Sequence, residues 1–324
     1  MKTHRHFLLD WAEQGRIPPG NLRRGLSLAG AFPSAAGWRR FLDHLLLWLG
    51  TLLAAAGVIF FFAYNWNDLG RFAKFGLAEG MVGIALFFVW RLGTERIAGK
   101  AALLAASLFV GALLALIGQT YQTGADTFEL FGTWALAILP WVLLGRFAAL
   151  WVVWLVLLNV AISLYYQAFG GLFGLLFGPR QSLWALFALN TLALALWESL
   201  AAQGVAWLRE RWATRLLATA SGALVTALVL YAIFDGHRGD SMAVPLWFAW
   251  LAAAYFVYRR LMPNIYMLAG GVLSVIVVVT AFLGRHLLEG RAEAGAFLFI
   301  GLTVIALSAM GGWWLKRVFS EEEA

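Results

Sequence analysis

One carboxylate stands inside an otherwise uncharged, apolar stretch of the sequence. Glu79 is flanked by Gly76, Gly80 and Gly83, and residues 75–90 contain no other charged side chain. A carboxyl group in apolar surroundings can bind a proton or a cation, which is the chemistry of coupled transport. It can equally be a protonated or hydrogen-bonded structural group, because the GxxxG spacing of Gly76 and Gly80 lets another helix approach and bury it.

A second group of polar residues surrounds the string GQTYQTGAD at residues 118–126. The candidates of this polar loop share acidic or hydrogen-bonding side chains: Asn65, Asp68, Gln119, Tyr121, Gln122, Asp126 and Glu129. One interpretation is a polar mouth that binds or admits a small solute. The other is an ion pair that ties the neighbouring chain segments together, in which Asp126 or Glu129 contacts Arg71 or Lys74.

Enzyme chemistry has little support in the sequence. His237 and His286 lie near carboxylates and could share a metal ion, but only if two separate loops converge. The chain contains no HExxH string, no GxSxG string and no P-loop, and its cysteine count is 0. We therefore expect no enzyme, no catalytic residue, no metal and no cofactor, and keep an outward-facing metalloenzyme as a weaker alternative.

The composition indicates which elements must position these residues. Apolar side chains make up 62% of the 324 residues and charged ones only 13%, against roughly 25% charged in a typical soluble domain. The lipid bilayer is therefore the expected surrounding and the first expected partner. The net charge of +7 is spread over short loops between apolar runs, which does not suggest nucleic-acid binding.

The apolar runs predict an all-α, polytopic transmembrane bundle of about ten spans, since a span needs about 20 apolar residues. The expected spans are residues 44–63, 72–90, 100–118, 128–144, 147–167, 181–201, 213–234, 241–259, 263–283 and 294–315. Only Gly145 and Arg146 separate the fourth span from the fifth, so a tight hairpin is required there. Asn159 and Asn190 lie within spans and can hydrogen-bond across helices. Glu198 lies near a helix end, so its carboxylate can reach the interface.

Lysine and arginine give the predicted orientation. With ten spans and both termini on one side, six of the 24 basic residues fall on the opposite side, namely Arg71, Lys74, Arg180, Arg238, Arg285 and Arg291. The positive-inside rule assigns the richer side to the cytoplasm. We therefore expect both termini in the cytoplasm and the polar loop on the outer side.

The segments outside the spans complete the predicted organisation. Residues 1–43 are expected to form a basic cytoplasmic helical hairpin, because Phe7, Leu8 and Trp11 have helical spacing and Pro18-Pro19-Gly20 is a turn signal. Spans one to five occupy 44–167, followed by a Gly/Phe-rich connector at 168–180. Spans six to ten occupy 181–315, and an acidic tail follows at 316–324.

Two strings resemble a known family. FFFAYNWNDL at residues 60–69, followed by Lys74, and GQTYQTGAD at residues 118–126 are similar to signatures of the bacterial membrane proteins grouped as DUF2157, and Gly15-Arg16-Ile17 is similar to the opening of that family. The resemblance ends at about residue 145. It implies a location in the bacterial cell envelope and no particular activity.

Two functions remain open. The first is a non-enzymatic scaffold or sensor that acts through other envelope membrane proteins. The second is a secondary transporter or channel that uses Glu79 and the polar loop at residues 119–129.

Overall fold

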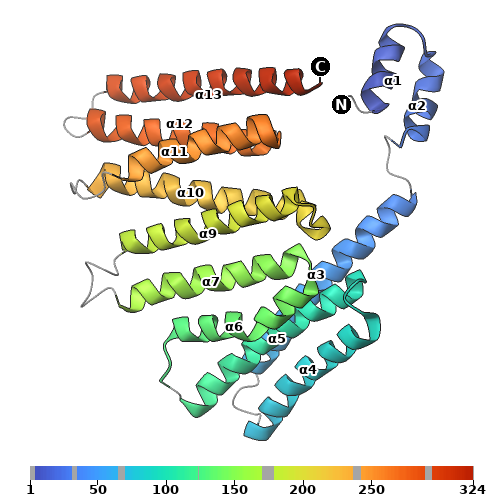
Figure 1. Ribbon diagram of the computed structural model, residues 1–324, viewed down its shortest axis with the longest axis vertical. Helices are drawn as coiled ribbons and strands as arrows, with labels where there is room; N and C mark the ends of the chain where they lie inside the picture. Colours follow the sequence, from blue (N-terminus) through green and yellow to red (C-terminus); the bar gives the residue numbers. More distant parts are fainter. Residues whose placement is uncertain are drawn as a thin grey trace.

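The computed structural model describes residues 4–30, 35–64, 70–122, 124–169, 179–235, 242–288 and 294–323. Every regular element in these ranges is a helix, as Figure 1 shows. The predicted all-α class is therefore confirmed. The glycine-rich run at 170–178 lies outside the described residues, as do Asn65, Asp68 and His237.

The predicted N-terminal hairpin is present. Helix α1 (His4–Glu13) and helix α2 (Pro19–Leu28) pack on each other. Gly15 has a φ of 70° in the connection, a conformation that glycine adopts without strain. Pro19 occupies the first turn of α2, where the absence of a proline N–H costs no helical hydrogen bond.

Nine described helices are long and apolar enough to cross a membrane. They are α3 (Ala35–Tyr64), α4 (Arg71–Leu92), α5 (Ile97–Tyr121), α6 (Thr127–Gly145), α7 (Ala148–Ala168), α9 (Pro179–Ala202), α10 (Arg211–Asp235), α12 (Ile265–Leu288) and α13 (Ala294–Glu323). Helix α3 begins at Ala35 and so includes residues that were predicted to belong to the hairpin. Helix α13 likewise continues into the predicted tail.

The eighth predicted span differs from the others. It falls on α11 (Ala243–Phe256), which has only 14 residues and passes directly into a π-helical turn, η2 (Val257–Leu261). A short 3₁₀ helix, η1 (Ala206–Arg209), joins α9 to α10. In Figure 1, α11 still runs between the same two ends of the bundle as its neighbours.

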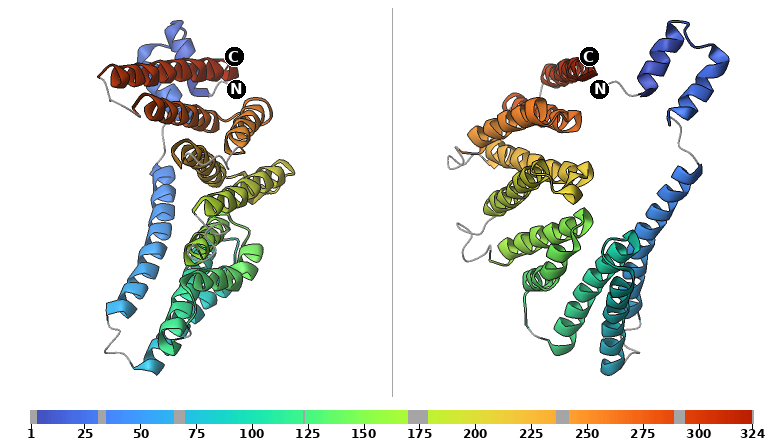
Figure 2. Two further views of the ribbon diagram at one scale, coloured as in Figure 1. Left: turned by 90° about the vertical axis from the view of Figure 1, so that its left-hand side faces the viewer. Right: turned by 45° about the vertical axis from the view of Figure 1, so that its right-hand side comes forward.

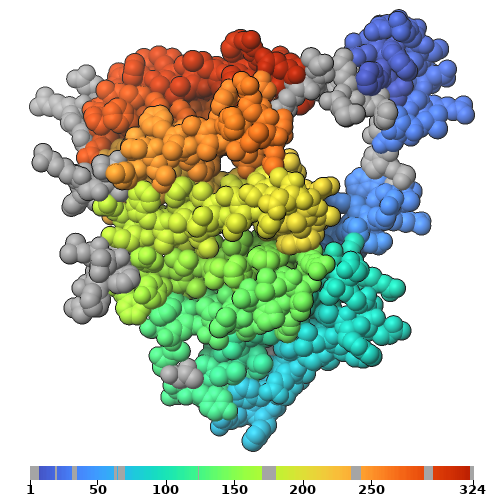
Figure 3. All heavy atoms as spheres, viewed as in Figure 1, coloured from blue at the N-terminus to red at the C-terminus, as the bar shows by residue number. Residues whose placement is uncertain are grey.

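The helices pack mainly in chain order. Each of α4, α5, α6, α7 and α9 packs on the next helix, α10 packs on α12, α12 packs on α13, and α11 lies against α10 and α12. The colours of Figure 3 therefore run in bands across the surface. Helix α3 packs on α5, and both views in Figure 2 place it apart from α9 to α13.

The connection between α6 and α7 is the tight turn that the sequence predicted. Arg146 adopts a left-handed conformation with a φ of 48°, and α7 begins two residues later at Ala148. Ile138 and Leu150 lie in the apolar core beside this turn with no exposed surface. In Figure 1, both chain termini lie on the same side of the bundle as this turn.

Candidate functional site

Helix α4 buries one face and leaves the other uncovered. Ala78 and Ala85 face α5 and are 3% and 6% exposed. Glu79 lies on the exposed face. A Cβ atom added at Gly76, Gly80 or Gly83 would meet nothing within 4 Å. No described helix of this chain therefore covers the small residues that were predicted to admit one.

Glu79 lies well inside the membrane-crossing part of α4. The helix has 22 residues, and Glu79 follows Arg71 by about 12 Å of helical rise. The hydrocarbon core of a bilayer is about 30 Å thick, so neither end of α4 brings this carboxylate to the aqueous phase. Glu79 has no hydrogen-bond or ion-pair partner among the described residues.

The end of α5 is joined to the start of α4 by aromatic contacts. The Arg71 guanidinium carbon lies 4.4 Å from the centroid of the Tyr121 ring. The rings of Phe75 and Tyr121 have centroids 5.9 Å apart. Gln122 ends α5 in a left-handed conformation. These contacts place Gln119, Tyr121 and Gln122 at the same end of the bundle as Arg71, as the topology predicted.

Asp126 and Glu129 have a different role from the predicted ion pair. They form a capping box at the start of α6, in which the Asp126 backbone N–H donates to Glu129 Oε2 at 3.2 Å. Carboxylates at a helix start accept hydrogen bonds from N–H groups that lack helical partners. The described residues contain no ion pair between either acid and Arg71 or Lys74. The predicted pairing is replaced by this capping box and by the Arg71–Tyr121 contact.

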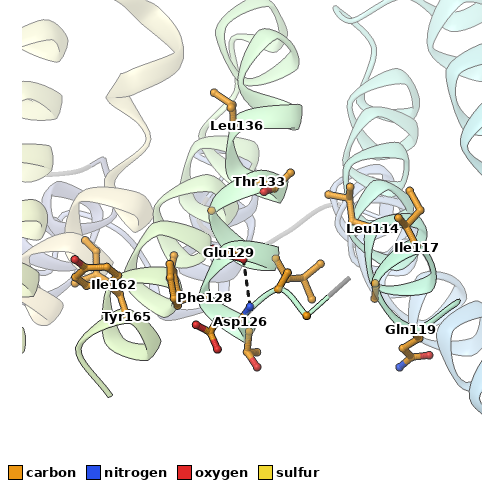
Figure 4. A pocket seen from close by; sticks show the side chains of 18 residues that line it. Leu114, Ile117, Gln119, Asp126, Phe128, Glu129, Thr133, Leu136, Ile162 and Tyr165 are labelled. Atoms are coloured by element: carbon orange, nitrogen blue, oxygen red, sulfur yellow. Dashed lines mark hydrogen bonds between the residues drawn. The ribbon is translucent and has the colours of Figure 1, made fainter. Parts of the chain in front are cut away.

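A pocket of about 860 Å³ lies between the end of α5, the start of α6 and α7. Figure 4 shows Gln119, Asp126, Glu129 and Tyr165 around it, with Leu136 farther along α6. Of the candidate loop residues, Gln119, Asp126 and Glu129 line this pocket. Glu79 does not line the pocket, so the two candidate features predicted from the sequence belong to separate sites.

Asn159 and Asn190 hydrogen-bond across helices as predicted, and the structure shows that each is the other's partner, which the sequence did not specify. Asn190 Nδ2 donates to Asn159 Oδ1 at 2.6 Å, and Asn159 Nδ2 lies 3.4 Å from Asn190 Oδ1. Each amide also donates to a carbonyl one turn earlier in its own helix. The pair joins α7 to α9 with its hydrogen-bonding groups satisfied, which identifies it as a structural contact.

Sequence reasoning missed a buried polar cluster around Glu198. The Glu198 residue is 7% exposed. Its Oε1 accepts from the Tyr258 hydroxyl at 3.2 Å, and both carboxylate oxygens lie 3.4 Å from Arg211 Nη1. Three elements, α9, α10 and η2, meet here. A charge pair across the short α9–α10 connection was readable from the sequence, but the π-helical turn that brings Tyr258 inward was not.

The acidic tail and the histidines also have defined surroundings. Glu321 pairs with Arg259 of η2 and, at 3.1 Å, with Arg317 of its own helix. His286 Nδ1 lies 2.9 Å from the Phe282 carbonyl oxygen. Within the described ranges, no group of three or more metal-binding side chains is present.

These features define a multi-pass, α-helical membrane protein. Residues 9–151 match the family described as "Predicted membrane protein (DUF2157)". The matched region contains both strings, the uncovered face of α4 and the part of the pocket lined by α5 and α6, so the resemblance is confirmed over this part of the chain. Comparisons with curated proteins and with solved structures find no match to this chain.

Proposed function

We propose that this protein is a non-enzymatic subunit of a membrane assembly in the bacterial inner membrane, where it acts through a partner membrane protein. The observation that carries the proposal is the position of Glu79, exposed within a membrane-crossing helix. Glu79 and the neighbouring Gly76, Gly80 and Gly83 define what we call the α4 open face.

Energetics favour a partner on the α4 open face. A charged side chain facing lipid costs about 2.5–3.5 kcal/mol on insertion scales. A helix packed against Gly76 and Gly80 removes that contact with lipid and offers a hydrogen-bonding group to Glu79. Small residues permit such close approach, and polar contacts between membrane helices contribute roughly 0.6–2 kcal/mol.

The partner is expected to be a different protein. In a twofold dimer centred on this face, each Glu79 would approach its own copy, because the same patch serves both subunits. Two nearby carboxylates disfavour the charged form of each other. A partner helix with a hydroxyl, amide or basic side chain complements Glu79 without this repulsion.

The proposed orientation follows from the basic residues. In Figure 1, the α4–α5, α6–α7 and α9–α10 connections lie on the side of the bundle that contains both termini. These connections contain Arg96, Arg146 and Arg209. The positive-inside rule places that side in the cytoplasm. The hairpin of α1 and α2 is then cytoplasmic, and the pocket beside Asp126 opens on the outer side.

Photocrosslinking at the α4 open face tests the proposal. The natural chain has no cysteine, so Gly83→Cys provides a single attachment point for a benzophenone maleimide. Labelled protein reconstituted with membranes of its source should give one dominant adduct with a second membrane protein, identified by mass spectrometry. Gly301→Cys is the matched control, because Gly301 is also a helical glycine with nothing within 4 Å of an added Cβ.

Two outcomes contradict the proposal. An adduct formed only with a second copy of this chain rejects the different partner. Equal adduct patterns at positions 83 and 301 reject a specific surface on α4. A dominant adduct at position 83 that is absent at position 301 supports it.

A second candidate function rests on the pocket beside the polar loop. Its volume of about 860 Å³ and its mixed lining of Asp126, Glu129, Thr133, Leu136 and Ile162 suit a small amphipathic solute. The protein would then act as a sensor or a transporter. Thr133→Trp fills the pocket, and it should abolish solute binding in thermal-shift screening of the purified protein while the adduct at position 83 persists.

A further inference from the structure

We infer that a groove between α10, α11 and α12 binds one anionic phospholipid, with an acyl chain in the groove and the phosphate at Arg215. The groove has a volume of about 510 Å³. It lies in the C-terminal half of the chain, outside the matched residues 9–151. The inference is therefore independent of the partner proposed for the α4 open face.

Small side chains create the groove. Its walls include Ala218, Gly222, Ala223, Ala227, Ala269 and Gly270. A Cβ atom added at Gly222 would lie 2.9 Å from the Trp250 ring, so this glycine lets Trp250 form the floor. A Cβ atom added at Gly270 would meet nothing within 4 Å. Ala223, Gly270 and Leu273 are exposed, so the groove opens toward the surrounding lipid.

The polar groups along the groove already have partners. Thr226 and Ser274 share a hydrogen bond of 2.6 Å, and Trp247 Nε1 donates to the Ser274 hydroxyl at 2.8 Å. The Tyr258 hydroxyl donates to Glu198. Because these groups are satisfied, the groove presents an apolar wall to its occupant. A hydrocarbon chain fits such a wall, since it requires no hydrogen bond.

The mouth of the groove carries a positive charge. The Thr219 and Tyr266 hydroxyls are 2.9 Å apart, and the Arg215 guanidinium carbon lies 5.3 Å from the centroid of the Tyr266 ring. No carboxylate of the described residues forms an ion pair with Arg215. Arg215 lies one helical turn before Thr219, toward the arginine-rich end of the bundle. A phosphate at this position would complement its charge.

A phospholipid combines both requirements in one molecule. Basic sites between membrane helices on the cytoplasmic side are suited to anionic headgroups. The apolar groove accounts for the chain and Arg215 accounts for the phosphate. Because the groove opens to lipid, the occupant can enter from the bilayer without crossing water.

Lipid retention tests this inference. The full chain is reconstituted in vesicles of equal phosphatidylglycerol and phosphatidylcholine, extracted in mild detergent, washed, and analysed for lipid per protein by mass spectrometry. The natural chain should retain about one lipid, enriched in phosphatidylglycerol. Arg215→Gln should reduce that enrichment about fivefold, which corresponds to the roughly 1 kcal/mol that a basic residue contributes near anionic lipid. Arg215→Lys should keep most of it.

Gly270→Phe should remove the retained lipid, because the ring would occupy the groove. Its control is Gly301→Phe, at an exposed glycine of α13 with nothing within 4 Å of an added Cβ; lipid retention there should be unchanged. Unchanged thermal unfolding of each variant shows that the fold is intact. Retention at the bulk lipid ratio by the natural chain overturns the inference, as does full retention by Gly270→Phe. Enrichment that survives Arg215→Gln overturns the assignment of the headgroup site.

Discussion

Two glutamates in membrane-crossing helices have opposite surroundings. Glu198 in α9 is buried and contacts Arg211 and Tyr258 of its own chain. Glu79 in α4 is exposed and has no such contact among the described residues. The same side chain thus has its partners within the C-terminal half of the bundle and lacks them at the N-terminal end. The proposed partner on the α4 open face would account for this difference, because it would supply Glu79 with the polar contact that Glu198 has within its own chain.

The largest expected effect tests the two glutamates directly. Glu198→Ala leaves the buried Tyr258 hydroxyl without its acceptor, and it should lower the free energy of unfolding by about 1–3 kcal/mol. Glu79→Ala in the purified protein should leave stability unchanged or raise it, since no contact within the chain is lost. Thermal unfolding in detergent measures both. Equal losses of unfolding free energy in the two variants would contradict the proposed difference between the surroundings of Glu198 and Glu79.

Two glycine substitutions compare the packed interior with the α4 open face without changing any charge. A methyl group at Gly111 would lie 2.4 Å from the Trp134 ring, so Gly111→Ala should destabilise the protein by about 1–3 kcal/mol. Gly76→Ala meets open space and should be neutral or slightly stabilising in the purified protein, because alanine favours helix. The same unfolding assay applies. A large loss at Gly76 would show that the purified chain covers its α4 open face.

The Asn159–Asn190 hydrogen bond tests how much a polar contact between two helices contributes to stability. Asn159→Leu should cost about 0.6–1.7 kcal/mol, because Asn190 loses its partner across the helix interface. Adding Asn190→Leu to this variant should lower the free energy of unfolding by less than Asn190→Leu alone does, because the double variant leaves no amide unsatisfied. A double-mutant cycle of unfolding free energies gives the coupling. Strictly additive losses would contradict a direct contact.

The smallest expected effect concerns the contact between the start of α4 and the end of α5. Tyr121→Leu removes the ring beneath Arg71 and should cost about 0.5–1 kcal/mol. Tyr121→Phe keeps the aromatic face and should retain most of that stability. Losses of equal size in the two variants would assign the role to the hydroxyl group instead of the ring.

Local patterns predicted much of this structure. The hairpin of α1 and α2 followed from apolar spacing and Pro19, and the turn at Arg146 followed from the length of the flanking apolar runs. Hydrogen bonding of Asn159 and Asn190 across helices followed from the cost of isolated amides in apolar helices, although the sequence did not pair the two residues. Each of these depends on neighbouring residues or on the bilayer as a solvent, and both are readable from the chain.

Other features depend on tertiary packing and were not readable. Hydropathy does not reveal which face of α4 meets α5, so Glu79 could not be placed on the open side from the sequence. The competition between helix capping and ion pairing at Asp126 was decided by the position where α6 begins. The π-helical turn at Val257–Leu261 determines which side chains of that segment face Glu198.

The most direct test of the central claim is the crosslink yield at Gly83→Cys with and without Glu79→Leu. A partner that contacts the Glu79 carboxylate should lose roughly 3- to 30-fold in affinity, corresponding to the roughly 0.6–2 kcal/mol of one polar contact between membrane helices. The adduct yield at a limiting partner concentration should fall accordingly, while Glu198→Ala, which alters no residue of the α4 open face, should leave the yield per folded molecule unchanged. An adduct yield that is the same with Glu79 and with leucine at this position would contradict the account.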